Sequence, residues 1–92
     1  MYEVIATNRF KKDLKACKKS GWNIKSLLEV VDLLKMGKSL PESKRDHLLT
    51  GNFKGFRECH IEPDWVLVYK IDDGAVVLTL VRTGTHSKIL KL

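Results

Sequence analysis

The spacing of the apolar residues changes near the middle of this chain, and that change constrains the fold more than any other feature. Up to Gly37 apolar residues recur at helical intervals, whereas from Phe53 to Val81 they form three runs rich in β-branched residues. Helices followed by consecutive strands are typical of the α+β class. A chain of 92 residues suffices for one hydrophobic core and not for two, so we expect a single domain over residues 1–92.

Two helices are predicted in the first half. Thr7 or Asn8 can cap a helix that extends to Lys19. A second helix is expected between Asn23 and Gly37, where glycine is a typical stop signal. The expected apolar stripe of the second helix consists of Ile24, Leu27, Leu28, Val31 and Leu34. The two helices should form an antiparallel pair.

A loop and four strands complete the expected order. Residues 38–52 lose the helical spacing and contain Pro41 and Gly51, so they predict a long loop. The strands are expected at residues 2–6, 53–62, 65–71 and 75–81. The predicted architecture is βααβββ, an antiparallel sheet with the helix pair on one face, followed by a short C-terminal turn or helix within residues 84–92.

Two short turns set the expected pairing of the last three strands. Residues 63–64, Pro-Asp, and residues 73–74, Asp-Gly, are typical two-residue hairpin turns. Pairing outward from them places Trp65 opposite Arg82, with His60 on the same face. We expect this face to stay partly open. The opposite face, expected to carry the helices, comprises Cys59, Ile61, Val66, Val68, Val77 and Val81.

The charge and the cysteines narrow the class of protein. Seventeen Lys plus Arg against 11 Asp plus Glu give a formal net charge of +6, which favours binding to nucleic acid through counterion release. Cys17 and Cys59 show neither metal-ligand spacing nor the density of a disulfide scaffold, so reduced thiols and a cytoplasmic location are expected. No apolar run suits export or a membrane span, and no motif indicates a metal or another cofactor.

Histidines supply the candidate chemistry. His47 lies in the long loop, His60 on the expected open face, and His86 just after the last strand, where the tail can bring it towards Arg82. RNA transesterification needs a base for the 2′-hydroxyl, positive charge for the phosphorane and an acid for the departing 5′-oxygen. These side chains supply all three parts without metal. Asp64 either orients a nearby histidine or is simply a turn residue.

The expected RNA contacts are aromatic and basic. On the open face, Trp65 can stack on an unpaired base, or it can belong to ordinary sheet packing. Tyr69 is expected in the core. The helix pair presents a basic surface that either lies on phosphates or is only solvated, and it consists of Lys11, Lys12, Lys15, Lys18, Lys19 and Lys25.

Three sequence blocks connect the chain to a known family. They are DHLLTG at residues 46–51, FRECHIEPDW at residues 56–65 and VRTGTH at residues 81–86. In their order and spacing, and in the preceding helix pair, the chain resembles the YafQ-type branch of the RelE/ParE toxin superfamily over essentially its whole length. One departure is Leu90, where the family carries an aromatic residue.

The resemblance implies a ribosome-dependent mRNA interferase with a RelE-like fold. Such a toxin enters the ribosomal A site, cuts the message within a codon and is held inactive by a cognate antitoxin. The implied partners are mRNA on the ribosome, 16S rRNA against the basic helices, and an acidic antitoxin segment. The family's active-site positions correspond to His47, His60, Asp64, Trp65, Arg82 and His86. Here His86 is the expected general acid, His60 or Asp64 the base or its helper, and Arg82 the phosphate clamp.

Two other functions remain open from the sequence. The superfamily also contains toxins that act on DNA gyrase and share the fold without being nucleases, although they generally lack such histidines. A plain basic nucleic-acid-binding module is the third possibility. Replacing His86 should separate them, because it should abolish mRNA cleavage in the nuclease and leave binding or gyrase inhibition nearly unchanged in the others.

Overall fold

The computed structural model describes residues 1–90, apart from the side chain of Leu90. Within these residues the elements are β1 (Glu3–Ala6), α1 (Asn8–Lys19), α2 (Ile24–Lys35), the 3-10 turn η1 (Glu42–Lys44), β2 (His47–Leu48), the 3-10 turn η2 (Gly51–Phe53), β3 (Arg57–Glu62), β4 (Trp65–Asp72), β5 (Val77–Gly84) and α3 (His86–Leu90). The predicted α+β class and order are confirmed, and the long loop contains the additional short strand β2. In this part of the chain no helix has the length and apolar character that a bilayer span requires.

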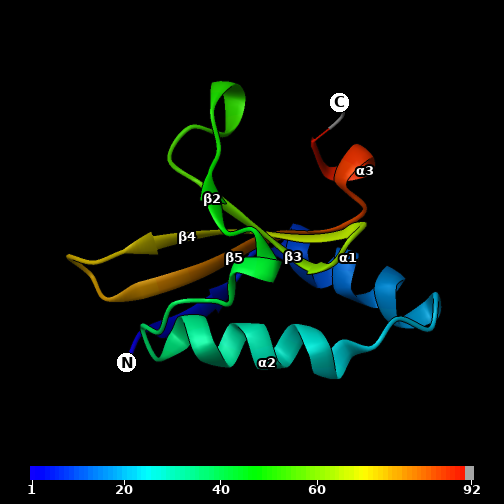
Figure 1. Cartoon of the computed structure of the whole chain (residues 1–92), viewed down its shortest axis with the longest axis horizontal. Coiled ribbons are helices and arrows are strands. Elements are labelled where there is room, and N and C mark those ends of the chain that lie inside the picture. The colour runs from blue at the N-terminus through cyan, green and yellow to red at the C-terminus, as the bar shows by residue number, and fades with distance from the viewer. Residues whose placement is uncertain (91–92) are drawn as a thin grey trace.

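The strands form one sheet in the order β1-β5-β4-β3-β2. Figure 1 shows α1 and α2 on one side of this sheet, whereas the segment around β2 and the helix α3 rise from the other side. The sheet is mixed rather than wholly antiparallel, because β1 runs parallel to β5. This pairing joins the two ends of the chain, and no local turn signal reveals the direction of such a non-local pair.

The helices begin and end where the sequence predicts. The Thr7 hydroxyl caps α1 by accepting a hydrogen bond from the Phe10 backbone N–H at 3.0 Å. Gly37, which follows α2, has a φ of 73°, a left-handed conformation that glycine adopts without steric cost. The apolar stripe of α2 differs in one position: Val30 is buried, whereas Leu28 points to solvent. Leu28 was wrongly placed in the stripe.

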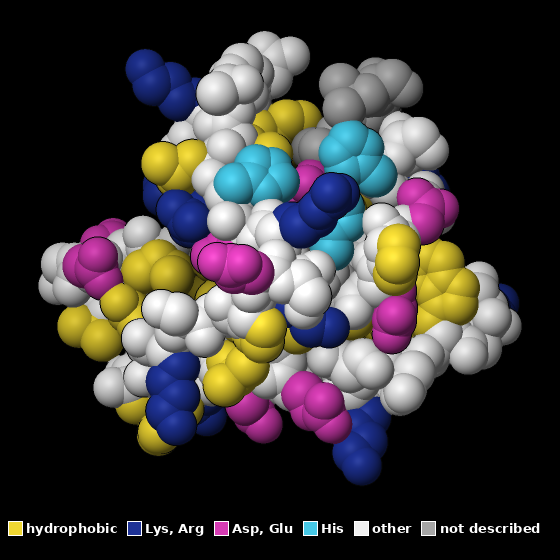
Figure 2. Space-filling model, in the orientation of Figure 1, with side chains coloured by type: hydrophobic (Ala, Val, Ile, Leu, Met, Phe, Trp, Pro, Cys, Tyr) yellow, Lys and Arg dark blue, Asp and Glu magenta, His cyan; other side chains and the backbone are white. Residues whose placement is uncertain are grey.

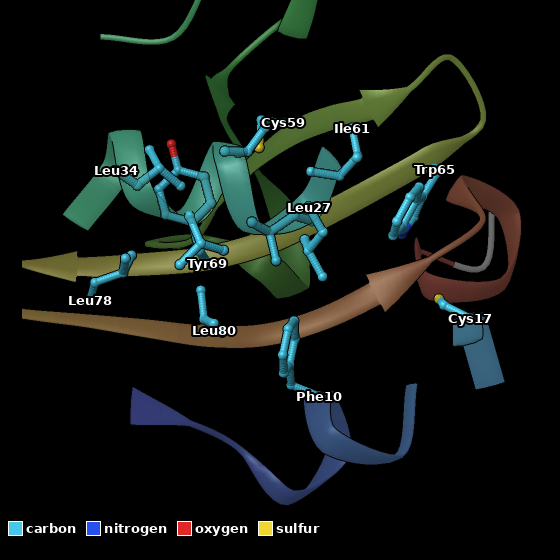
Figure 3. Packing of buried hydrophobic residues seen from close by; sticks show 13 residues of the cluster. Phe10, Cys17, Leu27, Leu34, Cys59, Ile61, Trp65, Tyr69, Leu78 and Leu80 are labelled. Carbon is cyan, nitrogen blue, oxygen red and sulfur yellow. The ribbon is translucent and has the colours of Figure 1, made fainter. Parts of the chain in front are cut away.

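The main core lies between the helix pair and the sheet. Figure 3 shows Phe10 of α1 and Leu27 of α2 gathered with side chains from the three long strands. Tyr69 is fully buried among them, as predicted. Cys59 and Ile61 also lie on this face, which confirms two of the positions expected under the helices.

The first hairpin has the predicted turn but a different register. Glu62 pairs with Trp65 across the two-residue turn, as expected. Ile61, however, is an extra residue on β3, so His60 pairs with Val66. An extra residue of this kind is a β-bulge, which reverses the faces of the residues beyond it. His60 and Trp65 therefore lie on opposite faces of the sheet, contrary to the prediction.

The second hairpin differs more. Asp72 pairs with Val77, so the connection has four residues where two were expected. A second bulge makes Val81 the extra residue on β5, and Arg82 then pairs with Val68 rather than Trp65. Neither bulge has a local sequence signal, because Ile61 and Val81 look like ordinary strand residues.

Together the bulges reverse the predicted faces of β4 and of β5 up to Leu80, whereas β3 keeps its predicted faces. Val66 and Val68, predicted under the helix pair, lie on the opposite face and pack against Ile89 of α3, and Val81 packs against the same cluster. The face away from the helices, which we call the open face, carries Glu58, His60, Val66, Val68 and Arg82.

Two neighbouring leucines of α2 test the observed core. Leu27 is 1% exposed and Leu28 is 54% exposed. We expect Leu27→Ala to lower the free energy of unfolding by about 2–5 kcal/mol, because it leaves a cavity in the core. Leu28→Ala should change it by less than about 0.5 kcal/mol. Urea unfolding followed by tryptophan fluorescence measures both, and equal losses would contradict the observed orientation of α2.

Candidate functional site

A buried carboxylate is the centre of the polar residues on the open face. Glu58 of β3 has a side chain only 1% exposed, and its Oε1 lies 3.4 Å from Nε2 of His60 and 3.6 Å from Nε2 of His47. Its Oε2 lies 3.6 Å from Nε2 of His86. We call these four residues the histidine cluster. Figure 2 shows the three histidines gathered on one face, among basic and acidic side chains.

Three separate segments bring the cluster together. His47 lies on β2 directly opposite Glu58. His60 stands two residues beyond Glu58 on β3, where alternation places it on the same face. His86 begins α3 immediately after β5, and its ring stacks on that of His60 at a centroid distance of 6.3 Å. The predicted convergence of His60 with His86 is thus observed, with His47 added.

Hydrogen bonds define which imidazole nitrogens face the carboxylate. Nδ1 of His47 lies 2.6 Å from the carbonyl oxygen of Arg45, and Nδ1 of His60 lies 3.0 Å from that of Pro63. A carbonyl oxygen can only accept, so both Nδ1 atoms carry a hydrogen. A neutral ring then presents the Nε2 lone pair to Glu58. Each contact becomes favourable only when a proton lies between Nε2 and the carboxylate.

The second oxygen of Glu58 is available for such a proton. Within residues 1–90, Oε2 is buried and makes no hydrogen bond. Buried polar atoms are nearly always hydrogen-bonded, so an unpartnered carboxylate oxygen among three imidazoles requires a functional or structural explanation. The cluster therefore gathers three imidazoles around a buried carboxylate with one unpartnered oxygen.

A second network holds the segment that carries His47. Asp46 accepts hydrogen bonds from Arg57 at 3.2 and 3.3 Å and from the Tyr69 hydroxyl. Burial raises the pKa of Tyr69, and the hydrogen bond to Asp46 raises it further, so the phenol stays a donor. These contacts fix the start of β2 against the sheet.

Arg82 lies on the open face, but a carboxylate already holds it. Its Nε and Nη2 donate to the two oxygens of Asp13 at 2.9 and 3.1 Å. Arg82 pairs with Val68, which in turn pairs with Glu58. The Cα of Arg82 therefore lies two strands from the Cα of Glu58, about 10 Å away across the sheet. The prediction that Arg82 and His60 lie on the same face of the sheet is confirmed by the strand register.

Trp65 and Asp64 are placed away from the histidines. Trp65 is 3% exposed on the helix side, where its Nε1 donates to Thr83 Oγ1 at 2.8 Å. The expected open-face position of Trp65 is wrong because of the bulge at Ile61. Asp64 is exposed in the turn, and within the described residues no hydrogen bond or ion pair joins it to a histidine. It borders a hollow of about 330 Å³ that Trp22, Asn23, Glu62 and Trp65 complete.

Basic side chains approach the cluster from one side. A hollow of about 340 Å³ next to His60 is also lined by Ser43, Lys44 and Arg45. Arg45 has a φ of 50°, a strained left-handed conformation that is common at functional sites. The helix lysines predicted to contact RNA are all exposed, namely Lys11, Lys12, Lys15, Lys18 and Lys25.

Sequence reasoning missed Glu58 and Asp13 as candidate site residues. Glu58 stands two residues before His60, so strand alternation alone places the two on one face. Asp13 lies between Phe10 and Cys17, at the spacing of the apolar stripe of α1, and a charge at such a position indicates a buried partner. Within residues 1–90 no group of three His, Cys, Asp or Glu side chains is arranged to hold a metal ion.

Known proteins are similar to this chain over nearly its whole length. The family described as "Bacterial toxin of type II toxin-antitoxin system, YafQ" matches residues 2–91. The mRNA interferase toxin YafQ of Escherichia coli K12 is 37% identical over 95% of this chain and 94% of its own length. A metal-bound toxin from Helicobacter pylori superposes with a TM-score of 0.91 at 42% identity, covering 97% of this chain and 99% of that one. The E. coli DinJ-YafQ toxin-antitoxin complex gives a TM-score of 0.86 at 35% identity, with 96% of each chain covered.

Proposed function

The chain belongs to the YafQ family of bacterial type II toxins, and from that premise we propose that it cuts mRNA in the A site of the ribosome. It is an mRNA interferase, an endoribonuclease that forms the toxin half of a toxin–antitoxin pair. A cognate antitoxin is its protein partner, as DinJ is the partner of YafQ. We infer that the cut stops translation and proceeds by acid–base transesterification without a metal ion.

The observation that carries this proposal is the convergence of three imidazoles on the buried carboxylate of Glu58. In transesterification a base removes the proton of a 2′-hydroxyl, and the oxygen attacks the adjacent phosphorus. The bond from phosphorus to the 5′-oxygen then breaks, and an acid protonates that oxygen. The products are a 2′,3′-cyclic phosphate and a 5′-hydroxyl, so the reaction needs no water and no oxidant.

We assign the base to His60 and the acid to His86. Their Nε2 atoms face different oxygens of Glu58, so one carboxylate contacts both members of the pair. After a turnover His60 holds the extra proton and His86 lacks one, and Glu58 offers a path for its return. His47 contacts the same oxygen of Glu58 as His60 does. Asp64 takes no part in the proton transfers, because it lies apart from the imidazoles.

The RNA is held by positive charge on two sides of the molecule. We place the nucleotide next to the cut in the hollow beside His60, where Lys44 and Arg45 meet its phosphate. The exposed lysines of α1 and α2 lie across the sheet from the cluster, and we assign them to 16S rRNA. An acidic antitoxin segment would cover the same basic surfaces. We place the reaction in the cytoplasm, which suits the free thiols of Cys17 and Cys59.

Primer extension on a defined mRNA in a purified translation system tests the proposal. We expect cuts within codons that need both the protein and ribosomes, and new 3′ ends that resist polyadenylation until the cyclic phosphate is removed. A parallel assay measures supercoiling by DNA gyrase. Equal cutting of free mRNA, or 3′-hydroxyl ends, would contradict the mechanism, and gyrase inhibition without any cut would favour the other branch of the superfamily.

A further inference from the structure

We propose that Asp13 is a positioning residue for RNA cleavage, which holds Arg82 so that the free edge of its guanidinium meets the scissile phosphate. The inference rests on the proposed function, together with the role of phosphate clamp that the family resemblance implies for Arg82. Asp13 lies on α1 and Arg82 on β5, 69 residues apart in the chain. The contact between them joins the helix layer directly to the open face.

Both oxygens of Asp13 are used. Oδ2 accepts from Nε of Arg82 at 2.9 Å and from the backbone N–H of Thr83 at 3.2 Å, while Oδ1 accepts from Nη2 at 3.1 Å. Asp13 is 8% exposed, so little water competes for these bonds. Asp13 therefore fixes both the guanidinium plane and the backbone from which it projects.

The geometry leaves a defined set of donors for a substrate. A guanidinium has five N–H groups, and Asp13 occupies one on Nε and one on Nη2. Within the described residues the two hydrogens on Nη1 and the second on Nη2 make no hydrogen bond, and one hydrogen from each of these nitrogens forms the free end of the guanidinium, next to the edge that Asp13 holds. A phosphate binds such an edge through two parallel hydrogen bonds. Without Asp13, the long side chain would sample many rotamers before each productive contact.

Packing alone gives no reason for a carboxylate here. The position belongs to the buried stripe of α1, between Phe10 and Cys17, where an apolar side chain would also pack. Buried ion pairs can often be replaced by apolar residues without loss of stability. The bulge at Val81 turns Arg82 towards the open face, and the bond to Thr83 holds the strand immediately after that bulge. Each of these features orients Arg82.

A double-mutant cycle measures the coupling. The variants are Asp13→Asn, Arg82→Lys and the double variant, and the measurement is the single-turnover rate of mRNA cleavage on programmed ribosomes at saturating protein. We expect Asp13→Asn to slow cleavage about 10–100-fold, because small displacements of a positioned group have effects of this size. In the Arg82→Lys background the same change should have almost no further effect. Asp32→Asn, which alters an exposed carboxylate on α2, is the matched control and should match the parent chain.

Asp13→Glu separates positioning from folding. Glutamate keeps the ion pair and should keep the fold, which the melting temperature measures. Its side chain is one methylene longer and displaces the guanidinium, so we expect a folded protein that also cleaves slowly. Parent-like rates in folded Asp13→Asn or Asp13→Glu would overturn the inference, as would an undiminished effect of Asp13→Asn in the Arg82→Lys background. If the parent chain made no cut at all, the proposed function itself would fail, and that outcome is distinct from the other two.

Discussion

Replacing His86 with Gln is expected to slow ribosome-dependent cleavage by about 10²–10⁴-fold, because the departing 5′-oxygen loses its general acid. The amide of glutamine can still donate a hydrogen bond to Oε2 of Glu58, so the contact of His86 is replaced without the acid. The side chain is 35% exposed at the start of α3, and we therefore expect an almost unchanged melting temperature. Single-turnover cleavage on programmed ribosomes and a thermal melt measure the two quantities.

A modified substrate distinguishes the acid from the base. Sulfur in place of the bridging 5′-oxygen leaves readily as a thiolate and needs little protonation. Such an RNA should restore most of the rate to His86→Gln and none of it to His60→Gln. Ser87→Ala, a change at the exposed neighbouring position on α3, is the control and should match the parent chain. Rescue of His60→Gln instead of His86→Gln would exchange the two roles.

The helices were predictable from the sequence because their signals are local. The Thr7 cap, the glycine at position 37 and the apolar spacing in α2 each act within a few residues. Such signals locate a helix without knowledge of its partners. The one misplaced residue, Leu28, lies beside the buried stripe, where only the contact with the sheet decides between burial and exposure.

The strand register was not predictable, because it depends on two bulges. Ile61 and Val81 are β-branched residues with no turn or glycine signal, and each is an extra residue in its strand. Adding a single residue reverses every face beyond it. Trp65 was consequently placed among the histidines, although it lies in the core on the other side of the sheet. The grouping of His60 with Arg82 survived, since both residues lie beyond a bulge.

The centre of the site was not predictable for a related reason. Glu58 is surrounded by side chains from β2, β3 and α3, and only its relation to His60 is local in the sequence. Glu58 has no distinctive spacing within β3, and its burial becomes visible only when distant segments close over it. The three histidines drew attention because of their chemistry, whereas the residue that connects them did not.

Glu58→Gln is expected to separate stability from activity. Glutamine has the same size as glutamate, and its amide N–H groups can donate to the Nε2 lone pairs that His47 and His60 present when their Nδ1 atoms carry the hydrogen. The neutral variant therefore satisfies the rings without an extra proton, so we expect a melting temperature equal to or above that of the parent chain. Its cleavage rate should fall by about 10² or more, because an amide neither stabilises a charged imidazole nor carries a proton between His60 and His86.

The control for this change is Glu3→Gln on β1, an exposed carboxylate at the edge of the sheet opposite β2. We expect it to keep the parent cleavage rate and melting temperature. A Glu58→Gln variant that cleaves normally would show that the imidazoles work without a shared carboxylate, and the proton path would then be wrong. A variant that melts far below the parent chain would show that the charge of Glu58 holds the rings together, which contradicts the hydrogen-bond assignment at Nδ1. A stable and inactive variant is the result expected of a carboxylate that takes part in the reaction, by stabilising a charged imidazole or by carrying a proton, because removal of a merely structural charge would not slow cleavage in a protein that is still folded.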